Sequence, residues 1–503
     1  MLIKIIYLMI IIFLKIGSFK NIKEKKKFFF FFLLKTKNNY SLKKKFILNS
    51  VKGIRTFDSK NYQRREYLFK IWKNISKSFA YDFYDLPILE NYDIFRKSNI
   101  NESYDFVKNN RHLILRPEIT PQLINYLFFK KNKLKEKNTN HDNNSQNYKK
   151  NYLLQNLKKV FKMCTIGQCF RYEKMSRCRK REHYQWNMDI IGIDNISAEI
   201  EIFTILISFF HYIKLIHNDI VFKINDKKII HYIIFKIFKK SFDFSYNRTQ
   251  LEIKKILHTL DKFHKINNYS FKLLLIKKCP YLKKRDIQLF NNVIHNITTL
   301  NQLEVYLNFN TSIYNDLKNL LSYFQKLNLH PFFQIDTTIV RGLDYYNNII
   351  FEIFYKHKNY RAICGGGRYD FFLDGKKIFA VGFAMGDIVI SEILFKNFMK
   401  ETNLHKNINV VSFFPFIVKE NIEDIHKEYY SILNILRNNN VKVYSLLQNN
   451  LKLSKALKKA NSLNPDYFLF FQEKDNIIFL KNLKTRKQIA VNSQNILSAY
   501  NNF

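Results

Sequence analysis

Cysteine is scarce in this chain of 503 residues, and the residue types that bind metals lack the spacing of a metal site. The five cysteines are an odd number and include no CxxC pair. This argues against a disulfide scaffold and against a cysteine-ligated zinc site, and it favours a reducing compartment. The 13 histidines include no HExxH motif. No internal repeat is evident.

Acidic residues are also in short supply, with 41 Asp and Glu against 84 Lys and Arg and a formal net charge of +43. A field of this sign favours a phosphate backbone or a membrane surface as partner. Part of the excess has another origin, because Lys, Asn, Ile, Phe and Tyr all have A/T-rich codons and are abundant throughout the chain. The charge therefore permits a nucleic-acid partner without proving one.

A long hydrophobic run is missing as well. The apolar stretch at residues 5–14, IIYLMIIIFL, has the length of a signal peptide and is too short for an ordinary membrane span. Twelve lysines and the single acid Glu24 lie in residues 1–50. This leader resembles the two-part targeting sequence of plastids that are entered through the secretory route, such as the apicoplast, with a mitochondrial presequence or a membrane anchor as alternatives. We expect no stable membrane association once it is removed.

The rest of the chain has the length for about two further domains. Residues 51–400 begin with a helical pattern at Tyr67, Ile71, Ile75 and Phe79, followed by an extended segment at residues 81–87. Residues 130–151 are rich in Asn and Lys without periodicity, which predicts a disordered insertion. Residues 195–334 are mostly helical in pattern, and we expect a helical insert at about 225–330.

Residues 407–503 alternate between strand and helix patterns. Strands are expected at residues 410–416, 441–447, 467–471 and 477–480, and helices at 422–438 and 453–461. This alternation predicts a small mixed sheet with helices on its faces.

The residue types best suited to a functional site are concentrated in residues 170–192, FRYEKMSRCRKREHYQWNMDIIG. Their pattern predicts two strands joined by a basic loop. The loop carries five cations in eight positions: Lys174, Arg177, Arg179, Lys180 and Arg181. With a paired Arg171 and Glu173 at its base, such a hairpin suits a polyanion that lies across a sheet. The alternative is a basic surface hairpin without a ligand.

This segment resembles motif 2 of class II aminoacyl-tRNA synthetases, in the version of the histidyl-tRNA synthetase family. The resemblance implies an α+β fold, with an antiparallel-sheet catalytic domain that carries a helical insert and a C-terminal α/β anticodon-binding domain. The helix and strand near residues 59–87 are similar to motif 1, the dimer-forming element of the class.

Motif 2 also implies roles for its residues. Arg171 would bind the α-phosphate of ATP, for which a guanidinium is better shaped than an ammonium group, and Glu173 would support the adenylate site. Gln185 and Asp189 match residues that hold the α-amino group of histidine. The loop residues Arg177 and Arg179 would face ATP and the acceptor end of the tRNA.

Three further stretches carry the resemblance. Residues 115–121, LRPEITP, match a segment of the histidine pocket, so Glu118 and Thr120 would contact histidine; as plain structure, Pro117 and Glu118 would begin a helix. Residues 340–346, VRGLDYY, resemble a signature peculiar to the family. There Arg341 would be a second cation on the α-phosphate, opposite Arg171, and Tyr345 and Tyr346 would line the imidazole pocket.

The last stretch is Cys364–Asp370, CGGGRYD, whose glycines let the backbone approach a ligand closely. It resembles the family's GGGRYD, which implies that Tyr369 helps to bind the histidine ring. The catalytic cations expected from the resemblance are therefore Arg171 and Arg341.

Motif 3 departs from the common family pattern, GFAxGxERL. Here GFAMG at residues 382–386 is followed by Asp387, Ile388 and Val389, so that Val389 takes the place of an arginine that neutralises ATP. A branch of the family from plant organelles and cyanobacteria is similar at this point. Arg181 and Arg368 are candidates to replace the missing cation.

The resemblance implies a histidine–tRNA ligase that activates histidine with ATP, with Mg²⁺ bridging the phosphates through protein ligands that the sequence does not assign. The expected partners are tRNA(His), L-histidine and a second copy in a homodimer. Two alternatives stay open: a non-catalytic regulatory paralogue such as the synthetase-like subunit of ATP phosphoribosyltransferase, and a protein that only binds tRNA.

Overall fold

The computed structural model describes residues 51–96, 102–127, 160–242, 245–341, 345–373, 375–395, 408–415, 423–447 and 451–502. It divides into two compact units, Met1–Thr56 and Phe57–Phe503. The predicted leader at 1–50, the predicted insertion at 130–151 and residues 342–344 lie outside the described residues. In the described part, no helix combines the length and the apolar character needed to span a bilayer.

The body of the larger unit is built on an eight-stranded sheet in the order β1-β5-β6-β11-β10-β9-β7-β8. The strands are β1 (Asp82–Phe83), β5 (Phe161–Phe170), β6 (Glu182–Ile191), β7 (Ile220–Asp226), β8 (Phe333–Ile335), β9 (Tyr346–Tyr355), β10 (Cys364–Leu373) and β11 (Lys376–Gly386). Neighbouring strands are antiparallel except for the pairs β1–β5 and β7–β8. The mainly antiparallel sheet confirms the predicted α+β class.

The predicted basic hairpin is β5 and β6, which pair in register from Phe161 opposite Ile191 to Phe170 opposite Glu182. The polar residues of β6 that were predicted to form the site are therefore at the centre of the sheet, because β6 pairs with β11 on its other side. The cationic loop spans residues 171–181.

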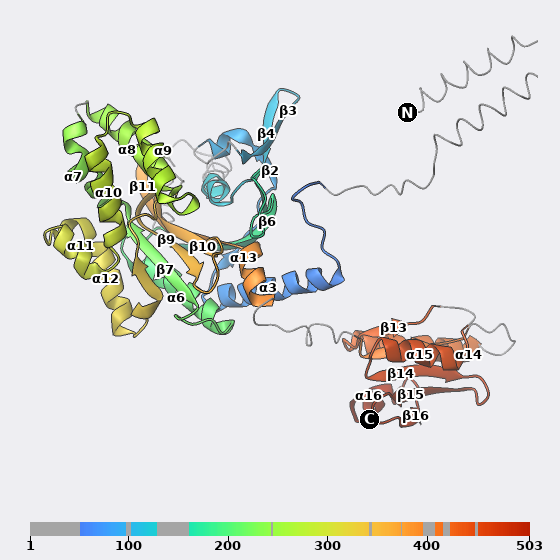
Figure 1. The fold of residues 1–503 in the computed structure, drawn as a ribbon. Helices are drawn as coiled ribbons and strands as arrows, with labels where there is room; N and C mark the ends of the chain where they lie inside the picture. The colour runs from blue at the N-terminus through green and yellow to red at the C-terminus, as the bar shows by residue number, and fades with distance from the viewer. Residues whose placement is uncertain are drawn as a thin grey trace, which may run out of the picture. The chain divides into compact units, whose positions relative to one another are not determined.

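One face of the sheet packs against α3 (Ser59–Ser78), α6 (Ser197–Tyr212) and α13 (Asp387–Ile393) (Figure 1). The predicted helical pattern is confirmed in α3, whose N-terminus is capped by Asp58. Trp72 of α3 stacks on Trp186 of β6 with ring centroids 5.7 Å apart, and the Trp186 indole donates a 2.9 Å hydrogen bond to Ser76 Oγ. The helix thus fixes the strand that carries the polar residues.

A second, three-stranded sheet consists of β2 (Leu89–Asn91), β4 (Arg111–Leu115) and β3 (Tyr104–Lys108). The extended segment predicted at residues 81–87 contributes only the two residues of β1 as strand. The helix that follows β4 begins at Thr120 rather than at Pro117, so the expectation that Pro117 and Glu118 occupy a first helical turn is wrong.

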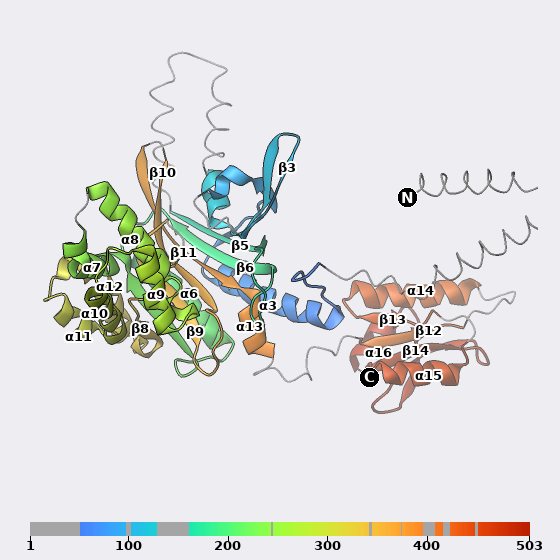
Figure 2. The ribbon, with the colours of Figure 1, turned by 45° about the horizontal axis from the view of Figure 1, so that its top comes forward.

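Helices predominate between β7 and β8, as predicted. They are α7 (Lys227–Phe238), α8 (Tyr246–Leu260), α9 (Asn268–Lys278), α10 (Lys284–Asn296), α11 (Leu300–Tyr306) and α12 (Thr311–Lys326). Figure 2 shows them gathered near β8 and β9, at the end of the large sheet, where α7 contacts β9 and α12 contacts β7. Ile229, Ile230, Ile233 and Ile234 of α7 are all fully buried, which explains the attachment.

The C-terminal part has a sheet in the order β13-β12-β14-β15-β16. Its elements are β12 (Val410–Phe413), α14 (Glu423–Asn438), β13 (Val443–Ser445), α15 (Leu453–Ser462), β14 (Tyr467–Gln472), β15 (Ile477–Asn482), β16 (Gln488–Ala490) and α16 (Ile496–Asn502). The first six elements were predicted, whereas β16 and α16 were not. Leu469 and Phe471 of β14 pack with α14 and α16, and Phe468 and Phe470 pack with α15, so both faces of the sheet are covered.

Candidate active site

A cavity of about 220 Å³ opens on the face of the sheet formed by β6, β11, β10 and β9. It brings together residues from all four stretches singled out in the sequence. Of the predicted site residues it is lined by Glu118, Thr120, Arg171, Glu173, Arg179, Gln185, Asp189, Arg341, Tyr345, Tyr346 and Tyr369. Segments that are more than 200 positions apart in the chain thus converge on one space, which a plain surface hairpin would not require.

Arg341 enters the cavity because β10 has a glycine beside it. A Cβ atom on Gly365 would lie 1.7 Å from Arg341 Nη1, so that a side chain there would displace the guanidinium. The backbone of Arg341 lies in the left-handed region with φ of 47°, a conformation that costs a non-glycine residue about 1–2 kcal/mol. Gly365 was predicted to admit a ligand, and the structure shows that it admits a side chain of the protein.

Asp189 lies in the floor of the cavity and is 1% exposed. Its Oδ1 accepts a 2.8 Å hydrogen bond from the hydroxyl of Tyr369, and its Oδ2 has no hydrogen-bond partner among the described residues. Burial raises the pKa of Asp189 to about 7, against the opposing effect of the Tyr369 hydroxyl. Gly382 makes room for this carboxylate, because a Cβ there would lie 2.1 Å from Oδ1.

Asn187 stands two residues before Asp189 on the same face of β6 and is 2% exposed. Its Nδ2 is 3.5 Å from Thr120 Oγ1, while its Oδ1 has no partner within the described part of the chain. Two buried oxygen acceptors, one on Asn187 and one on Asp189, therefore lack donors. A buried acceptor is costly without a donor, so this pair suits a ligand that carries N–H groups.

Glu118 and Tyr345 close another side of the cavity, where the Tyr345 hydroxyl donates to Glu118 Oε2 at 3.1 Å. The ring of Tyr345 packs on Tyr346, at 4.7 Å between centroids, and edge-on against Tyr369, at 5.8 Å. Gln185 also lines the cavity, with its Oε1 3.4 Å from the buried Cys169 thiol. The three tyrosine rings together form an aromatic wall, against which a flat ring of a ligand could pack.

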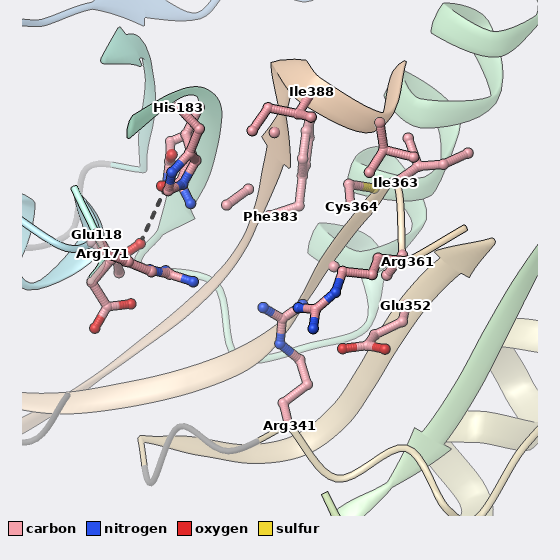
Figure 3. A pocket seen from close by; sticks show the side chains of 18 of the residues that line it. Glu118, Arg171, His183, Arg341, Glu352, Arg361, Ile363, Cys364, Phe383 and Ile388 are labelled. Atoms are coloured by element: carbon pink, nitrogen blue, oxygen red, sulfur yellow. Dashed lines mark hydrogen bonds between the residues drawn. The ribbon is translucent and has the colours of Figure 1, made fainter. Parts of the chain in front are cut away.

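Arg171 of motif 2 points into the cavity from the side opposite Arg341 (Figure 3), and Arg179 also lines the cavity. Arg171 is held by its Nε, which donates to the Pro117 carbonyl at 2.9 Å. Glu173 forms its salt bridge with Arg179 rather than with Arg171, so the predicted pairing of Arg171 with Glu173 is wrong. The hairpin loop turns back on itself and brings Arg179 over Glu173, which leaves the Arg171 head group directed at the cavity.

Three other predicted cations lie elsewhere. Arg177 is exposed and pairs with Glu392, at 2.6 Å from Nη2 to Oε1. Arg181 lies over the ring of Tyr172, at 3.7 Å from its centroid. Arg368 is buried and donates to both carboxylate oxygens of Glu199 and to two backbone carbonyls. Neither Arg181 nor Arg368 lines the cavity, so neither replaces the arginine absent at Val389.

Sequence reasoning missed several lining residues. His183, Asn187, Glu352 and Arg361 line the cavity, although none of them was expected from the sequence. Alternation along β6 could have identified His183 and Asn187, since both share a face with the predicted Gln185 and Asp189. Glu352 lies within β9 and Arg361 lies between β9 and β10, and no local pattern marks them.

A larger cavity of about 910 Å³ adjoins the first and extends toward the helical region, where Lys223, Asp261 and His264 line it. The two cavities share Glu118, Arg171, Glu173, Arg179, Arg341, Glu352, Arg361 and Ala362. These shared residues, four of which are arginines, form the boundary between the two cavities and are called the neck below. No group of three or more His, Cys, Asp or Glu suited to a metal ion is present in the described ranges.

The chain was compared with known proteins. A model of the family described as histidyl-tRNA synthetase matches residues 146–387. A chloroplastic/mitochondrial histidine–tRNA ligase of Arabidopsis thaliana is 33% identical over 361 residues, which are 70% of this chain and 67% of the relative. A histidine–tRNA ligase of Leptospira biflexa is 26% identical over 463 residues, or 89% of this chain and 95% of the relative.

Among solved structures, the histidyl-tRNA synthetase from Nostoc sp. PCC 7120 superposes with a TM-score of 0.61 at 18% identity. The alignment covers 91% of this chain and 99% of that one. At this identity the likeness concerns the fold, and it includes the sheet on which the cavity is built.

Proposed function

This chain belongs to the histidyl-tRNA synthetase family, and on that premise we propose how its residues carry out the ligation of histidine to tRNA. The family's activity is ATP-dependent: the histidine carboxylate attacks the α-phosphate and pyrophosphate leaves, after which a hydroxyl at the 3′ end of the tRNA takes the histidyl group and AMP is released. The observation that carries the assignment of roles is the convergence of the four predicted stretches on one cavity.

Histidine is proposed to lie over β6 and against the aromatic wall. Its ammonium group supplies N–H donors for the unpartnered oxygens of Asp189 and Asn187, with Gln185 and Thr120 beside them. Its ring packs among Tyr345, Tyr346 and Tyr369, next to Glu118. Asn187 is an addition to the residues expected from the sequence.

ATP is proposed to place its α-phosphate between Arg171 and Arg341, which point in from opposite walls (Figure 3). Both anions, carboxylate and phosphate, must approach each other, so fixed cations lower the barrier by neutralising the charge that develops. The Tyr346 ring beneath Arg341, 5.4 Å from its guanidinium carbon, and the Pro117 contact of Arg171 hold both groups before substrate arrives. Glu173 keeps Arg179 in place at the cavity edge.

Mg²⁺ is proposed to bind with the phosphates. It commonly uses one or two carboxylates plus phosphate oxygens, and Glu352 offers a carboxylate at the neck beside Arg341 and Arg361. When bound, the ion would draw charge from the leaving pyrophosphate.

The tRNA acceptor end is proposed to approach along the basic loop, where the side chain of Arg177 is 62% exposed, and through the neck shared by both cavities. The C-terminal mixed sheet, within the predicted domain 407–503, is proposed to bind the anticodon, and residues 51–400 to form the catalytic domain. These assignments are supported by the Leptospira alignment, which covers nearly the whole relative.

A homodimer is proposed from the motif 1 region. Phe83, Ile88, Leu89, Phe106 and Val107 are all at least 40% exposed on or next to β1, β2 and β3, although they are apolar. An exposed apolar group of this kind suits burial against a second copy. Sedimentation of the purified protein would test it, and a monomer at micromolar concentration would contradict it.

The compartment is proposed to be a plastid-like organelle such as the apicoplast, with the mitochondrion as alternative. The basic leader and the chloroplastic/mitochondrial relative support an organelle address. Residues 1–50 fused to a fluorescent protein would test this, and a cytosolic signal would contradict it.

The decisive test is histidine-dependent exchange of pyrophosphate into ATP on residues 51–503 without tRNA. We expect exchange with histidine alone among the amino acids, abolished in Arg341→Ala. A folded protein that binds histidine without exchange would instead support a regulatory paralogue.

A further inference from the structure

The ATP site lacks a cation where motif 3 normally supplies one. Val389 is 6% exposed and, with Ile388 and Phe383, forms an apolar part of the cavity wall. Arg181 and Arg368 are engaged outside the cavity, so the compensating charge must come from another element.

Arg361 is placed where it could supply this compensating charge. It lies between β9 and β10, is solvent-exposed, and lines both cavities at their shared neck. Among the described residues, no hydrogen bond or salt bridge engages its guanidinium, whose electrostatic neighbours are Glu102 and Glu352. Figure 3 shows Arg361 on the same side of the cavity as Glu352, which is one of its electrostatic neighbours.

The charge balance of the neck favours a polyanion there. Four arginines, Arg171, Arg179, Arg341 and Arg361, line it together with three glutamates. Glu118 accepts a hydrogen bond from Tyr345, Glu173 pairs with Arg179, and Glu352 also has interactions within the protein. The arginines also repel one another: burial lowers the pKa of Arg179 to about 10, and Arg361 and Arg171 add to this effect.

We infer that Arg361 binds the β- and γ-phosphates of ATP and supplies the positive charge that motif 3 lacks at Val389. The inference rests on the proposed function. With the α-phosphate placed between Arg171 and Arg341 as proposed, the outer phosphates would extend along the lining that these two arginines share with Arg361. A planar guanidinium can donate two parallel hydrogen bonds to phosphate oxygens, which lysine cannot.

The test compares Arg361→Ala, Arg361→Lys and wild type in pyrophosphate exchange and in direct titrations with ATP, AMP and histidine. Loss of a charged hydrogen-bonding partner should weaken ATP binding about 10- to 100-fold, with the lysine variant in between. Affinities for AMP and histidine should stay unchanged, since neither carries the outer phosphates. Arg285→Ala, on the exposed surface of α10, is the matched control.

The possible outcomes distinguish a failure of the proposed function from a failure of the role given to Arg361. Wild type without histidine-dependent exchange would contradict the proposed function itself. An active wild type whose ATP affinity survives Arg361→Ala would overturn the role of Arg361 alone. So would an equal loss of ATP, AMP and histidine binding, which indicates a structural role, or a defect confined to histidine transfer, which would place Arg361 on the tRNA.

Discussion

The hydroxyl of Tyr369 donates a 2.8 Å hydrogen bond to Oδ1 of Asp189, whereas Oδ2 of the same carboxylate has no partner among the described residues. One oxygen is thus fixed by the protein and the other is left for substrate. This arrangement orients the carboxylate while preserving its capacity to accept from a charged amine.

Histidine affinity should fall in acid because of Asp189. Its pKa of about 7 means that the group becomes protonated below neutrality, and a neutral carboxyl attracts an ammonium ion weakly. We expect the dissociation constant for histidine to rise by up to about tenfold between pH 7 and pH 6. Calorimetric titrations of wild type and Asp189→Asn separate this effect from titration of the substrate imidazole, because the variant should keep only the latter.

The same residue should make the ligand-free protein less stable in base. The folded-state pKa lies well above the ordinary value for an aspartate, so the stability that Asp189 contributes is present in acid and is lost as pH rises toward 7. Asp189→Asn removes the buried charge, and its melting temperature should therefore exceed that of wild type at pH 8, with a smaller difference at pH 5. A variant that melts lower at pH 8 would contradict the burial argument.

Arg171→Ala and Arg341→Ala should each slow histidine activation by about 10²–10³-fold, the usual effect of removing a preorganised cation from a developing charge. Stopped-flow or exchange kinetics at saturating histidine would measure it. Exchange rates within threefold of wild type would argue that the α-phosphate lies elsewhere.

Asn187 should contribute to histidine binding through its unpartnered Oδ1. Asn187→Ala removes this acceptor and should raise KM for histidine about tenfold while leaving KM for ATP near its wild-type value. Parallel changes in both constants would point to general damage to β6 rather than to a contact with histidine.

Gly365→Ala should impair activation as strongly as the loss of Arg341, since the added Cβ would lie 1.7 Å from Arg341 Nη1. Gly375→Asn is the control: no atom lies within 4 Å of its Cβ position, and asparagine tolerates the left-handed backbone found there. Circular dichroism would verify that both variants fold. An active Gly365→Ala would show that the arginine can be rearranged at little cost.

The hairpin, α3 and most elements of the C-terminal sheet could be predicted because each depends on a local hydrophobic pattern. The extended segment predicted at Tyr81–Pro87 is longer than the strand that forms there, because only Asp82 and Phe83 pair with β5. Likewise α16 was not foreseen, because its seven residues bury only Ile496 fully.

The site residues implied by the family resemblance mostly line one cavity, but their pairing could not be predicted. Glu173 forms a salt bridge with Arg179 across a turn of the loop. Arg368 forms a salt bridge with Glu199 of α6, which is distant in sequence. Such partnerships depend on the path of the chain in three dimensions. Arg361 escaped notice for the same reason, because its importance comes from the neck that it lines.

Gly365 and Gly382 are two of only eleven glycines in the chain. Glycine codons begin with two guanines, so the A/T bias that fills this sequence with lysine and asparagine works steadily to remove them. The glycines that remain are not equally constrained, because Gly375 has open space at its Cβ position whereas Gly365 and Gly382 have none. Next to Arg341 and Asp189, a codon change away from glycine would therefore place a Cβ atom against a side chain of the proposed site.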